Sequence, residues 1–241
     1  MSSREKNARS WYASTVWRAA RATPPIPTWT RISTTVSRPN SPNRALLPIR
    51  LKIPISGRTV SRVIQRKGHP LKLALFSFIL GQHQRTLDWL SGLPFVDPAR
   101  IGFYGLSYGG KTAVRVPPLL DRYALSICSA DFNEWGWKNT SVESKYSYMV
   151  TQEYDMIEFD FGNVVNYSDL ANLMAPRPFM VERGHFDGVA PDEWVAYEYS
   201  KVRFFYDTKM KMPDRTSIEF FTGPHTINGQ GTFEFLKRHL R

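Results

Sequence analysis

The sequence has very little cysteine and no long apolar run. Cys128 is the single cysteine among 241 residues, so the chain cannot form an internal disulfide. Its cysteine content therefore does not distinguish an oxidising from a reducing compartment. No apolar stretch reaches the ~18 residues that a membrane-spanning helix needs. The best stretch, 71–80, is interrupted by Lys72 and Ser77. Hydrophobic residues still make up 42% and aromatic residues 14%, which excludes a wholly disordered chain. We therefore expect a soluble protein with a packed core and no membrane span.

Acidic residues are almost missing from the first 70 residues. These carry 14 Lys and Arg against one acid, a net charge of +13, whereas residues 71–241 carry 18 against 20, a net charge of −2. The total of +11 therefore comes from one segment, and no nucleic-acid partner is expected. The same segment holds 9 Ser, 7 Thr and 8 Pro but 2 Gly. We predict a basic Ser-, Thr-, Pro- and Arg-rich segment at 1–60, poorly structured or atypical, and a folded domain at 61–241.

Two further patterns occur in this basic segment. From Arg44 to Ile64 the apolar residues partly alternate, so one or two strands are expected there. An Arg-rich, acid-poor N-terminus also fits an organelle transit peptide, but Pro24, Pro25 and Pro27 oppose the amphipathic helix that such a peptide uses. There is no clear signal peptide, so the compartment is left open and a cytoplasmic location is favoured.

Helical and strand patterns alternate from residue 71 onward. Helices are expected at 71–90, 110–120, 167–174, 192–208 and 232–240. Strands are expected at 100–104, 124–130, 177–182 and 217–221, with a long irregular stretch at 131–161. Alternation of this kind predicts an α/β fold with a mostly parallel sheet and helices on both faces.

A glycine-rich turn follows the first of these predicted strands. The segment Gly105-Leu106-Ser107-Tyr108-Gly109-Gly110 has the pattern G-x-S-x-G, with one extra glycine, between an apolar strand and a helix. Such a turn strains the backbone of the serine and holds its hydroxyl clear of the sheet. The helix that follows points N–H groups at the same place, so the Tyr108 backbone N–H is a candidate oxyanion donor. Ser107 is the candidate nucleophile, the alternative being an incidental serine in a glycine-rich turn.

A serine nucleophile needs a base, and the chain has five histidines. His69 and His83 precede the serine, and His239 lies among basic residues of the last predicted helix, where a solvated face is the simpler explanation. His225 follows the last predicted strand, at the sheet edge where catalytic groups of open α/β sheets collect. We therefore predict His225 as the base. His185 is expected at the surface or beside the pocket.

The base must be oriented by an acid, and the loop after the third predicted strand offers Asp187 at the same edge. Asp-Gly is a frequent turn pair, so Asp187 alone would be an ordinary turn residue. With its two partners, the order Ser107, Asp187, His225 is the chain order of triads built on this kind of turn. Asp131 and Glu182 are weaker rivals for the acid role.

The chain from about 71 to 241 resembles the α/β-hydrolase superfamily, and within it the dienelactone hydrolase-like and acetyl xylan esterase-like branches. The shared features are the elbow around Ser107, Ala-Pro-Arg-Pro at 175–178, Gly184–Asp187, and Gly-Pro-His at 223–225. The resemblance implies Ser107 as nucleophile, His225 as general base and acid, and Asp187 as the orienting acid. It identifies no substrate.

One part of the family pattern has no counterpart in this chain. Relatives carry three or four strands before the elbow, with a His-Gly-type loop that supplies a second oxyanion donor. No such loop occurs here, and His69 is followed by Pro70. The N-terminal strands are therefore expected to be missing or atypical. Either the second donor comes from another group, or the basic segment is a non-native reading such as a shifted frame or a wrong start site.

The leading interpretation is a serine hydrolase that cleaves a small-molecule carboxylic ester through an acyl-enzyme. A prolyl-oligopeptidase-like peptidase is the enzymatic alternative, disfavoured because 241 residues leave no space for its usual gating domain. The third interpretation is a catalytically impaired hydrolase-fold protein, or a binding protein whose basic N-terminus contacts nucleic acid or anionic lipid, for which arginines scattered among proline and serine are weak evidence.

The remaining motifs are less specific. The aromatic-rich stretch 135–149 is expected either to bind an apolar acyl or aryl group or to pack in the core. Cys128 is expected as a buried strand residue. No metal-ligand spacing, phosphate-binding loop or dinucleotide fingerprint is present, so we expect no metal and no cofactor. The oligomeric state is left open.

Overall fold

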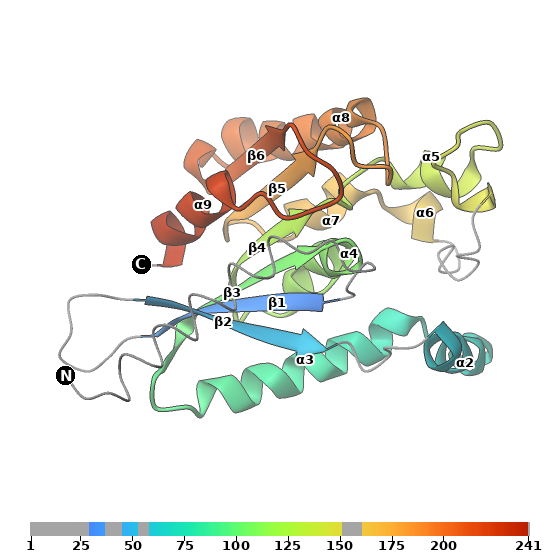
Figure 1. The fold of residues 1–241 in the computed structure, drawn as a ribbon. Helices are drawn as coiled ribbons and strands as arrows, with labels where there is room; N and C mark the ends of the chain where they lie inside the picture. Colours follow the sequence, from blue (N-terminus) through green and yellow to red (C-terminus); the bar gives the residue numbers. More distant parts are fainter. Residues whose placement is uncertain (1–28, 37–44, 53–57, 151–160, 241) are drawn as a thin grey trace.

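The computed structural model describes residues 29–36, 45–52, 58–150 and 161–240. Six of its strands form one sheet in the order β2-β1-β3-β4-β5-β6 (Figure 1). These strands are β1 (Trp29–Val36), β2 (Ala45–Lys52), β3 (Val96–Leu106), β4 (Tyr123–Ser129), β5 (Phe179–Gly184) and β6 (Thr216–Phe221). Most of the predicted basic segment 1–60, including its prolines at 24–27, lies outside the described residues.

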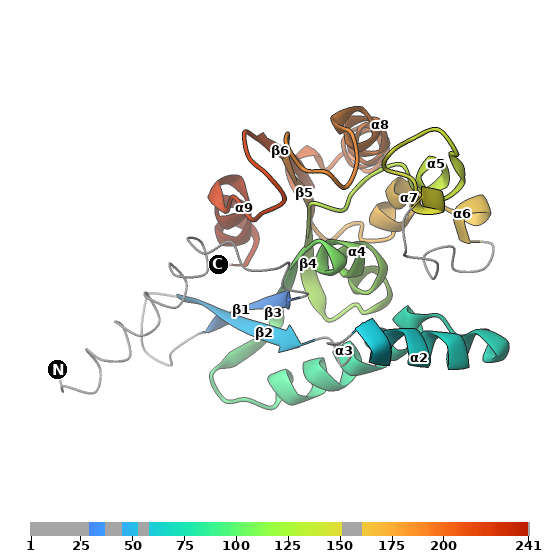
Figure 2. The same ribbon diagram turned by 45° about the vertical axis from the view of Figure 1, so that its right-hand side comes forward.

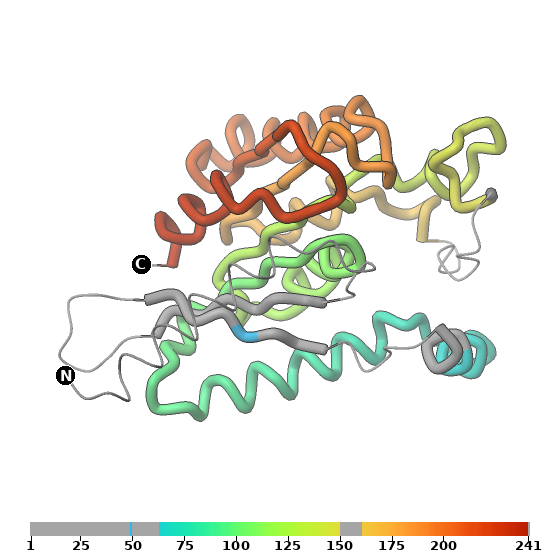
Figure 3. Tube along the Cα trace, viewed as in Figure 1, coloured from blue at the N-terminus to red at the C-terminus, as the bar shows by residue number. Residues whose placement is uncertain are grey.

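The strands from β3 to β6 are parallel, and each pairs with the strand that follows it in the sequence. The colours of Figure 3 change in the same order across this part of the sheet. These strands correspond to the four strands predicted after residue 71. The α/β fold with a mostly parallel sheet is thereby confirmed. Because these strands run in one direction, the segments that follow them all leave the sheet at the same edge.

The other two strands form an antiparallel edge. β1 pairs antiparallel with both β2 and β3, and Thr30 lies opposite Gly105 of the elbow strand. β2 corresponds to one of the strands expected between 44 and 64, whereas β1 has no counterpart among the predicted strands. Both lie in the segment predicted to be poorly structured or atypical, and the domain boundary at residue 60 stays a prediction.

Helices cover both faces of the sheet. They are α2 (Arg58–Gly68), α3 (Leu75–Ser91), α4 (Tyr108–Arg115), α5 (Trp135–Thr140), α6 (Phe161–Val164), α7 (Tyr167–Asn172), α8 (Asp192–Arg203) and α9 (Gln230–Leu240). Figure 2 shows α9 on one side of β5 and β6, with α7 and α8 on the other. None of the described helices is long and apolar enough to cross a bilayer.

Two buried clusters hold these layers together. The larger one packs α3, α4, α7 and α8 against one face of the sheet and includes Phe103 and Phe179. The smaller one packs α9 against the other face through Leu236, Tyr104 and Met180. Phe103 and Tyr104 are neighbours in β3 yet belong to different clusters, because successive side chains of a strand point to opposite faces.

Several element ends differ from the predicted ones. The stretch after β2 continues as α2 rather than as a second strand, because Val60, Val63 and Ile64 have the spacing of a helix. α4 ends at Arg115 instead of 120, where a short 3₁₀ turn rich in proline follows. The predicted helix 192–208 consists of α8 and a π-helical turn at Phe204–Lys209.

The Ala-Pro-Arg-Pro motif has a structural role. Arg177 donates hydrogen bonds to the carbonyl oxygens of Pro117, Leu120 and Tyr123, at 2.9, 3.1 and 3.0 Å. Its guanidinium thereby ties the turn after α4 to the start of β5. Burial lowers the pKa of Arg177, and the nearby Asp121 carboxylate opposes that shift.

Candidate active site

Ser107 occupies a sharp turn between β3 and α4. Its backbone has φ 61° and ψ −118°, a conformation that a non-glycine residue adopts only under strain. The turn is tight, because a Cβ on Gly105 would stand 2.0 Å from the Gly109 carbonyl oxygen. The Ser107 N–H donates to the Ser129 carbonyl oxygen at 3.0 Å, which fixes the turn to the end of β4. The elbow predicted from the G-x-S-x-G pattern is therefore present.

Asp187 and His225 meet at the same edge of the sheet. Asp187 follows β5 and His225 follows β6, and the Nδ1 atom of the imidazole lies 2.9 Å from Asp187 Oδ2. The Asp187 side chain is fully buried and that of His225 is 20% exposed. The second oxygen of Asp187 accepts the Val189 N–H at 2.9 Å. An imidazole with one nitrogen on a buried carboxylate is held in one orientation, which is what a catalytic base requires.

The two loops that carry this pair are bonded to each other through their backbones. The Phe186 N–H donates to the Gly223 carbonyl oxygen at 3.0 Å, and the His185 N–H donates to the Phe221 carbonyl oxygen at 2.9 Å. The loops approach so closely that a Cβ on Gly184 would lie 2.5 Å from the Gly223 oxygen. Glycine at 184 is required by this contact, which explains part of the predicted Gly184–Asp187 motif.

Arg183 supports the acid loop from within β5. Its side chain is buried, its Nη2 donates to the Asp187 carbonyl oxygen at 2.9 Å, and its Nε donates to Asp192 at 2.9 Å. It also bonds the Ala190 carbonyl oxygen, and its Nη1 lies 3.5 Å from Asp187 Oδ2. Arg183 is not among the site residues predicted from the sequence. The feature that marks Arg183 is a charged side chain within a strand whose residues are all buried.

The two rival acids are engaged elsewhere. Asp131 accepts the hydroxyl of Tyr167 at 2.7 Å, and Glu182 accepts hydroxyl and backbone N–H groups around β5. Neither contacts His225 in the described structure. Burial raises the pKa of the Glu182 carboxyl, and the hydrogen bonds that it accepts oppose part of that rise.

The other histidines have local partners. His83 is buried under β3 and β4 and shares a hydrogen bond of 2.9 Å with the Tyr123 hydroxyl, and burial lowers its pKa to about 4. His185 bonds Asp192 and stacks on a neighbouring ring of β6. His239 lies against Phe235 and is partly buried, where a solvated position was expected.

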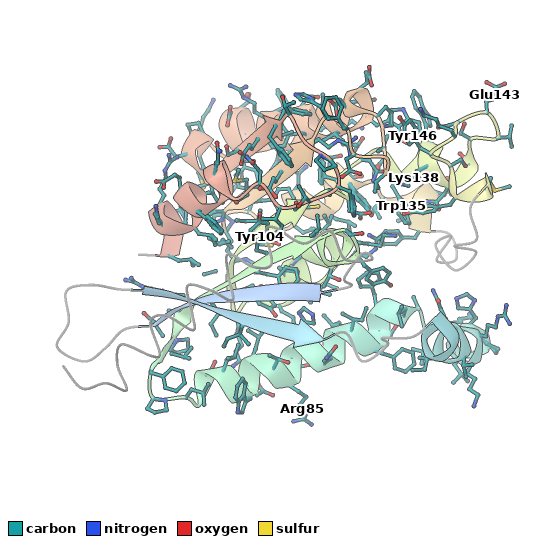
Figure 4. All side chains as sticks on the ribbon, in the orientation of Figure 1. Arg85, Tyr104, Trp135, Lys138, Glu143 and Tyr146 are labelled. Atoms are coloured by element: carbon teal, nitrogen blue, oxygen red, sulfur yellow. The ribbon has the colours of Figure 1, made fainter. Side chains whose placement is uncertain are left out.

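The aromatic-rich stretch 135–149 contributes to the core as well as to the surface. Trp135 and Tyr148 are buried around the Lys111 ammonium, which donates to the Tyr148 hydroxyl at 2.9 Å. Trp137 is exposed and packs edge-on against Trp194 of α8. Figure 4 places this stretch on the side of the sheet toward which β5 points. Cys128 is buried as expected, and desolvation raises the pKa of its thiol.

The serine and the histidine share the sheet edge without a direct bond. Within the described residues, no hydrogen bond joins the Ser107 hydroxyl to His225. Bonds between nucleophile and base are often long until a substrate is in place. Tyr108, the predicted oxyanion donor, is the first residue of α4, so its N–H belongs to the first turn, whose N–H groups point out of the helix end. No group of three or more potential metal ligands is found in the described part of the chain.

Comparison with known proteins bears on the fold. No protein-family model matches the chain. A carbohydrate esterase family 15 glucuronoyl esterase from Caldicellulosiruptor kristjansonii superimposes with a TM-score of 0.56 at 18% identity, covering 68% of this chain and 49% of that one. A recombinant glucuronoyl esterase from Sporotrichum thermophile gives a TM-score of 0.56 at 20% identity, covering 70% and 52%. The chain has the α/β-hydrolase fold.

The likeness extends to the fold and no further, because the identities are low. A third solved structure, the glucuronoyl esterase catalytic domain from Hypocrea jecorina, has a TM-score of 0.52 at 16% identity and covers 70% of this chain and 52% of that one. The chain thus spans about half the length of the solved structures that it matches.

Proposed function

We propose that the protein is a serine-dependent carboxylic ester hydrolase with Ser107, Asp187 and His225 as its catalytic triad. The observation that carries the proposal is the 2.9 Å contact between Asp187 and His225, formed at the sheet edge where the strained Ser107 turn also ends. The solved structures with the same fold include enzymes named as glucuronoyl esterases, which supports ester hydrolysis.

The reaction proceeds in two steps. In the first, the Ser107 oxygen forms a bond to the ester carbonyl carbon while His225 takes the hydroxyl proton and then returns it to the departing alkoxide. In the second, His225 takes a proton from the water that attacks the acyl carbon. The bond from that carbon to the Ser107 oxygen then breaks, His225 returns the proton to the Ser107 oxygen, and the acid is released. Asp187 holds the imidazole orientation and stabilises its protonated form. The Tyr108 N–H stabilises the oxyanion of each tetrahedral intermediate.

A second oxyanion donor is not assigned. In relatives it comes from a loop next to the elbow strand, and here the neighbour of β3 on that side is β1. β1 is antiparallel to β3, so its first residue, Trp29, lies near the site edge, and the residues before it lie outside the described ones. Loss of one donor lowers turnover by about 10²- to 10³-fold.

An assay on the full chain tests the proposal. Purified protein is offered aryl esters of short and long acids, an alkyl ester of glucuronic acid, and a prolyl peptide, and is separately treated with a fluorophosphonate. We expect ester hydrolysis and covalent labelling of Ser107. Ser107→Ala should lose both, with turnover lower by about 10⁵-fold or more. Ser200→Ala, which changes a serine on the outer face of α8, is the control that should retain both.

Three outcomes would contradict the proposal. Labelling of a serine other than Ser107 would reject the nucleophile. Cleavage of the prolyl peptide in preference to all esters would favour the peptidase alternative. A folded protein that neither hydrolyses esters nor reacts with the fluorophosphonate would favour a catalytically impaired hydrolase fold.

A further inference from the structure

β5 contains a buried carboxylate that the proposed reaction does not use. Glu182 is fully buried, lies between Ser129 of β4 and Glu219 of β6, and faces the α9 side of the sheet with Tyr104. Taking a carboxylate out of water costs several kcal/mol unless donors replace the water. The donors around Glu182 therefore indicate what this side chain holds in place.

The two oxygens of Glu182 bind different parts of the molecule. Oε2 accepts the hydroxyls of Tyr104 and Ser129, at 2.8 and 2.6 Å, and both of these belong to the sheet. Oε1 accepts the backbone N–H groups of Gly229 and Asn228, at 2.9 and 3.2 Å. These two residues end the loop that begins after β6 and contains His225. Oε1 also accepts the Thr232 hydroxyl of α9 at 3.4 Å. One oxygen is thus fixed to the sheet, and the other to the histidine loop and the start of the helix that follows it.

The histidine loop is held at both ends. At its front, the Gly223 carbonyl oxygen accepts the Phe186 N–H of the acid loop. At its rear, Glu182 binds the backbone at 228–229, and Glu219 accepts the Gly231 N–H at 2.9 Å. His225 lies between these two attachments. Removal of Glu182 would release the backbone at 228–229 and leave Glu219, which also accepts the Asn228 side-chain amide, as the rear attachment.

We propose that Glu182 is a positioning residue that keeps the His225 imidazole on Asp187 by fixing the rear of the histidine loop through its Oε1 atom. The inference rests on the proposed function, because it assigns Glu182 to the base of that triad. Backbone N–H groups cannot turn to become acceptors, whereas the Tyr104 and Ser129 hydroxyls can. The loop therefore needs an acceptor at this position, and the sheet side accommodates either an acceptor or a donor.

Two variants of Glu182 separate these requirements. Glu182→Gln keeps an oxygen for the loop N–H groups and offers its amide N–H to the hydroxyls, so it should retain kcat within a few-fold. Glu182→Leu removes both acceptors, and kcat should fall by about 10²-fold with little change in KM, because an active-site group displaced by about 1 Å loses that much. Where Glu182→Leu does not fold, Glu182→Asp, which withdraws the carboxylate from the loop, replaces it with the same expectation.

The matched control is another buried glutamate that does not touch the histidine loop. Glu198 of α8 is fully buried and accepts the Ser168 N–H at 2.9 Å, which links α8 to α7. Glu198→Leu should lower the free energy of unfolding but leave kcat of the folded protein unchanged. All variants are compared as folded full-length protein at equal concentration, with folding checked by circular dichroism.

A second readout is independent of ester hydrolysis. The proton of His225 Nδ1 in its bond to Asp187 gives a low-field proton NMR signal, which should persist in Glu182→Gln and Glu198→Leu. It should broaden or disappear in Glu182→Leu or Glu182→Asp. Retention of esterase activity in Ser107→Ala would contradict the proposed function. The low-field signal of His225 would still show whether Glu182 positions the imidazole, because it does not depend on ester hydrolysis.

Two results would overturn the positioning role. One is a folded Glu182→Leu protein with unchanged kcat and an unchanged low-field signal, even though Ser107→Ala is inactive. The other is Glu182→Gln as impaired as Glu182→Leu, which would show that the charge of Glu182, and not its acceptor for the loop, is what the site requires.

Discussion

The parallel and antiparallel parts of the sheet contribute differently to this molecule. β3, β5 and β6 run in one direction, so the turns after them bring Ser107, Asp187 and His225 to a single edge. β1 and β2 run antiparallel to their neighbours and supply backbone pairing beside β3. Strand direction, more than strand number, therefore decides which part of a sheet assembles a site. The parallel part should be sensitive in turnover as well as in stability, and the antiparallel part in stability alone.

The largest expected effect lies in the parallel part. Asp187→Asn keeps the size of the side chain but offers an amide to His225 Nδ1, which favours the wrong tautomer, and kcat should fall by up to about 10⁴-fold. Steady-state kinetics on an aryl ester measure the change. Asp131→Asn is the control, since Asp131 bonds Tyr167 and not His225. A severe loss in Asp131→Asn with a nearly silent Asp187→Asn would show that the acid is misassigned.

The helix layer under the parallel strands should make the protein sensitive to acid. Burial lowers the pKa of His83 from 6.5 to about 4. Between these two pH values the unfolded chain therefore binds a proton at His83 that the folded chain does not bind. The contribution of His83 to stability is complete above pH 6.5 and is lost as the pH falls toward 4, by about 3 kcal/mol in total.

Urea unfolding at pH 7 and pH 4.5 measures this loss. His83→Gln cannot titrate, so its stability should fall less between the two pH values than that of the wild type by about 2 to 3 kcal/mol. Equal losses in both proteins would mean that His83 takes up its proton without unfolding. This effect adds a stability contribution to the parallel part, whose other expected effects concern turnover.

The smallest effect is expected in the antiparallel part. Ile32 lies in the middle of β1, opposite Ile49 of β2 and Phe103 of β3. Ile32→Pro removes one N–H from a central strand and should lower the free energy of unfolding by about 1 to 3 kcal/mol. Ile32→Val, which keeps the N–H, should be nearly neutral. If kcat per folded molecule also fell by orders of magnitude, β1 would have to be part of the site and the contrast between the regions would fail.

Much of the parallel part could be predicted, because its signals are local. Each of β3 to β6 is an apolar run between turn or helix signals, and the elbow is a short pattern whose strained turn depends on Gly105 and Gly109. β1 could not be predicted in the same way. Its sequence, 29–36, has no apolar run of that kind, and its place in the sheet depends on pairing with β2 and β3.

The α/β class, the order of the candidate triad residues and the elbow could be predicted from the amino-acid sequence, because periodicity and glycine spacing act over a few residues. Which carboxylate meets His225 became clear in the folded sheet, since Asp187 and Asp131 both follow strands of that sheet and Glu182 lies within one. Hydrogen bonds between residues 38 to 78 positions apart, such as those of His225 with Asp187 and of Glu182 with Tyr104, leave no periodic trace in the chain. They depend on strand register and on the face to which each side chain points, and packing of the whole sheet sets both.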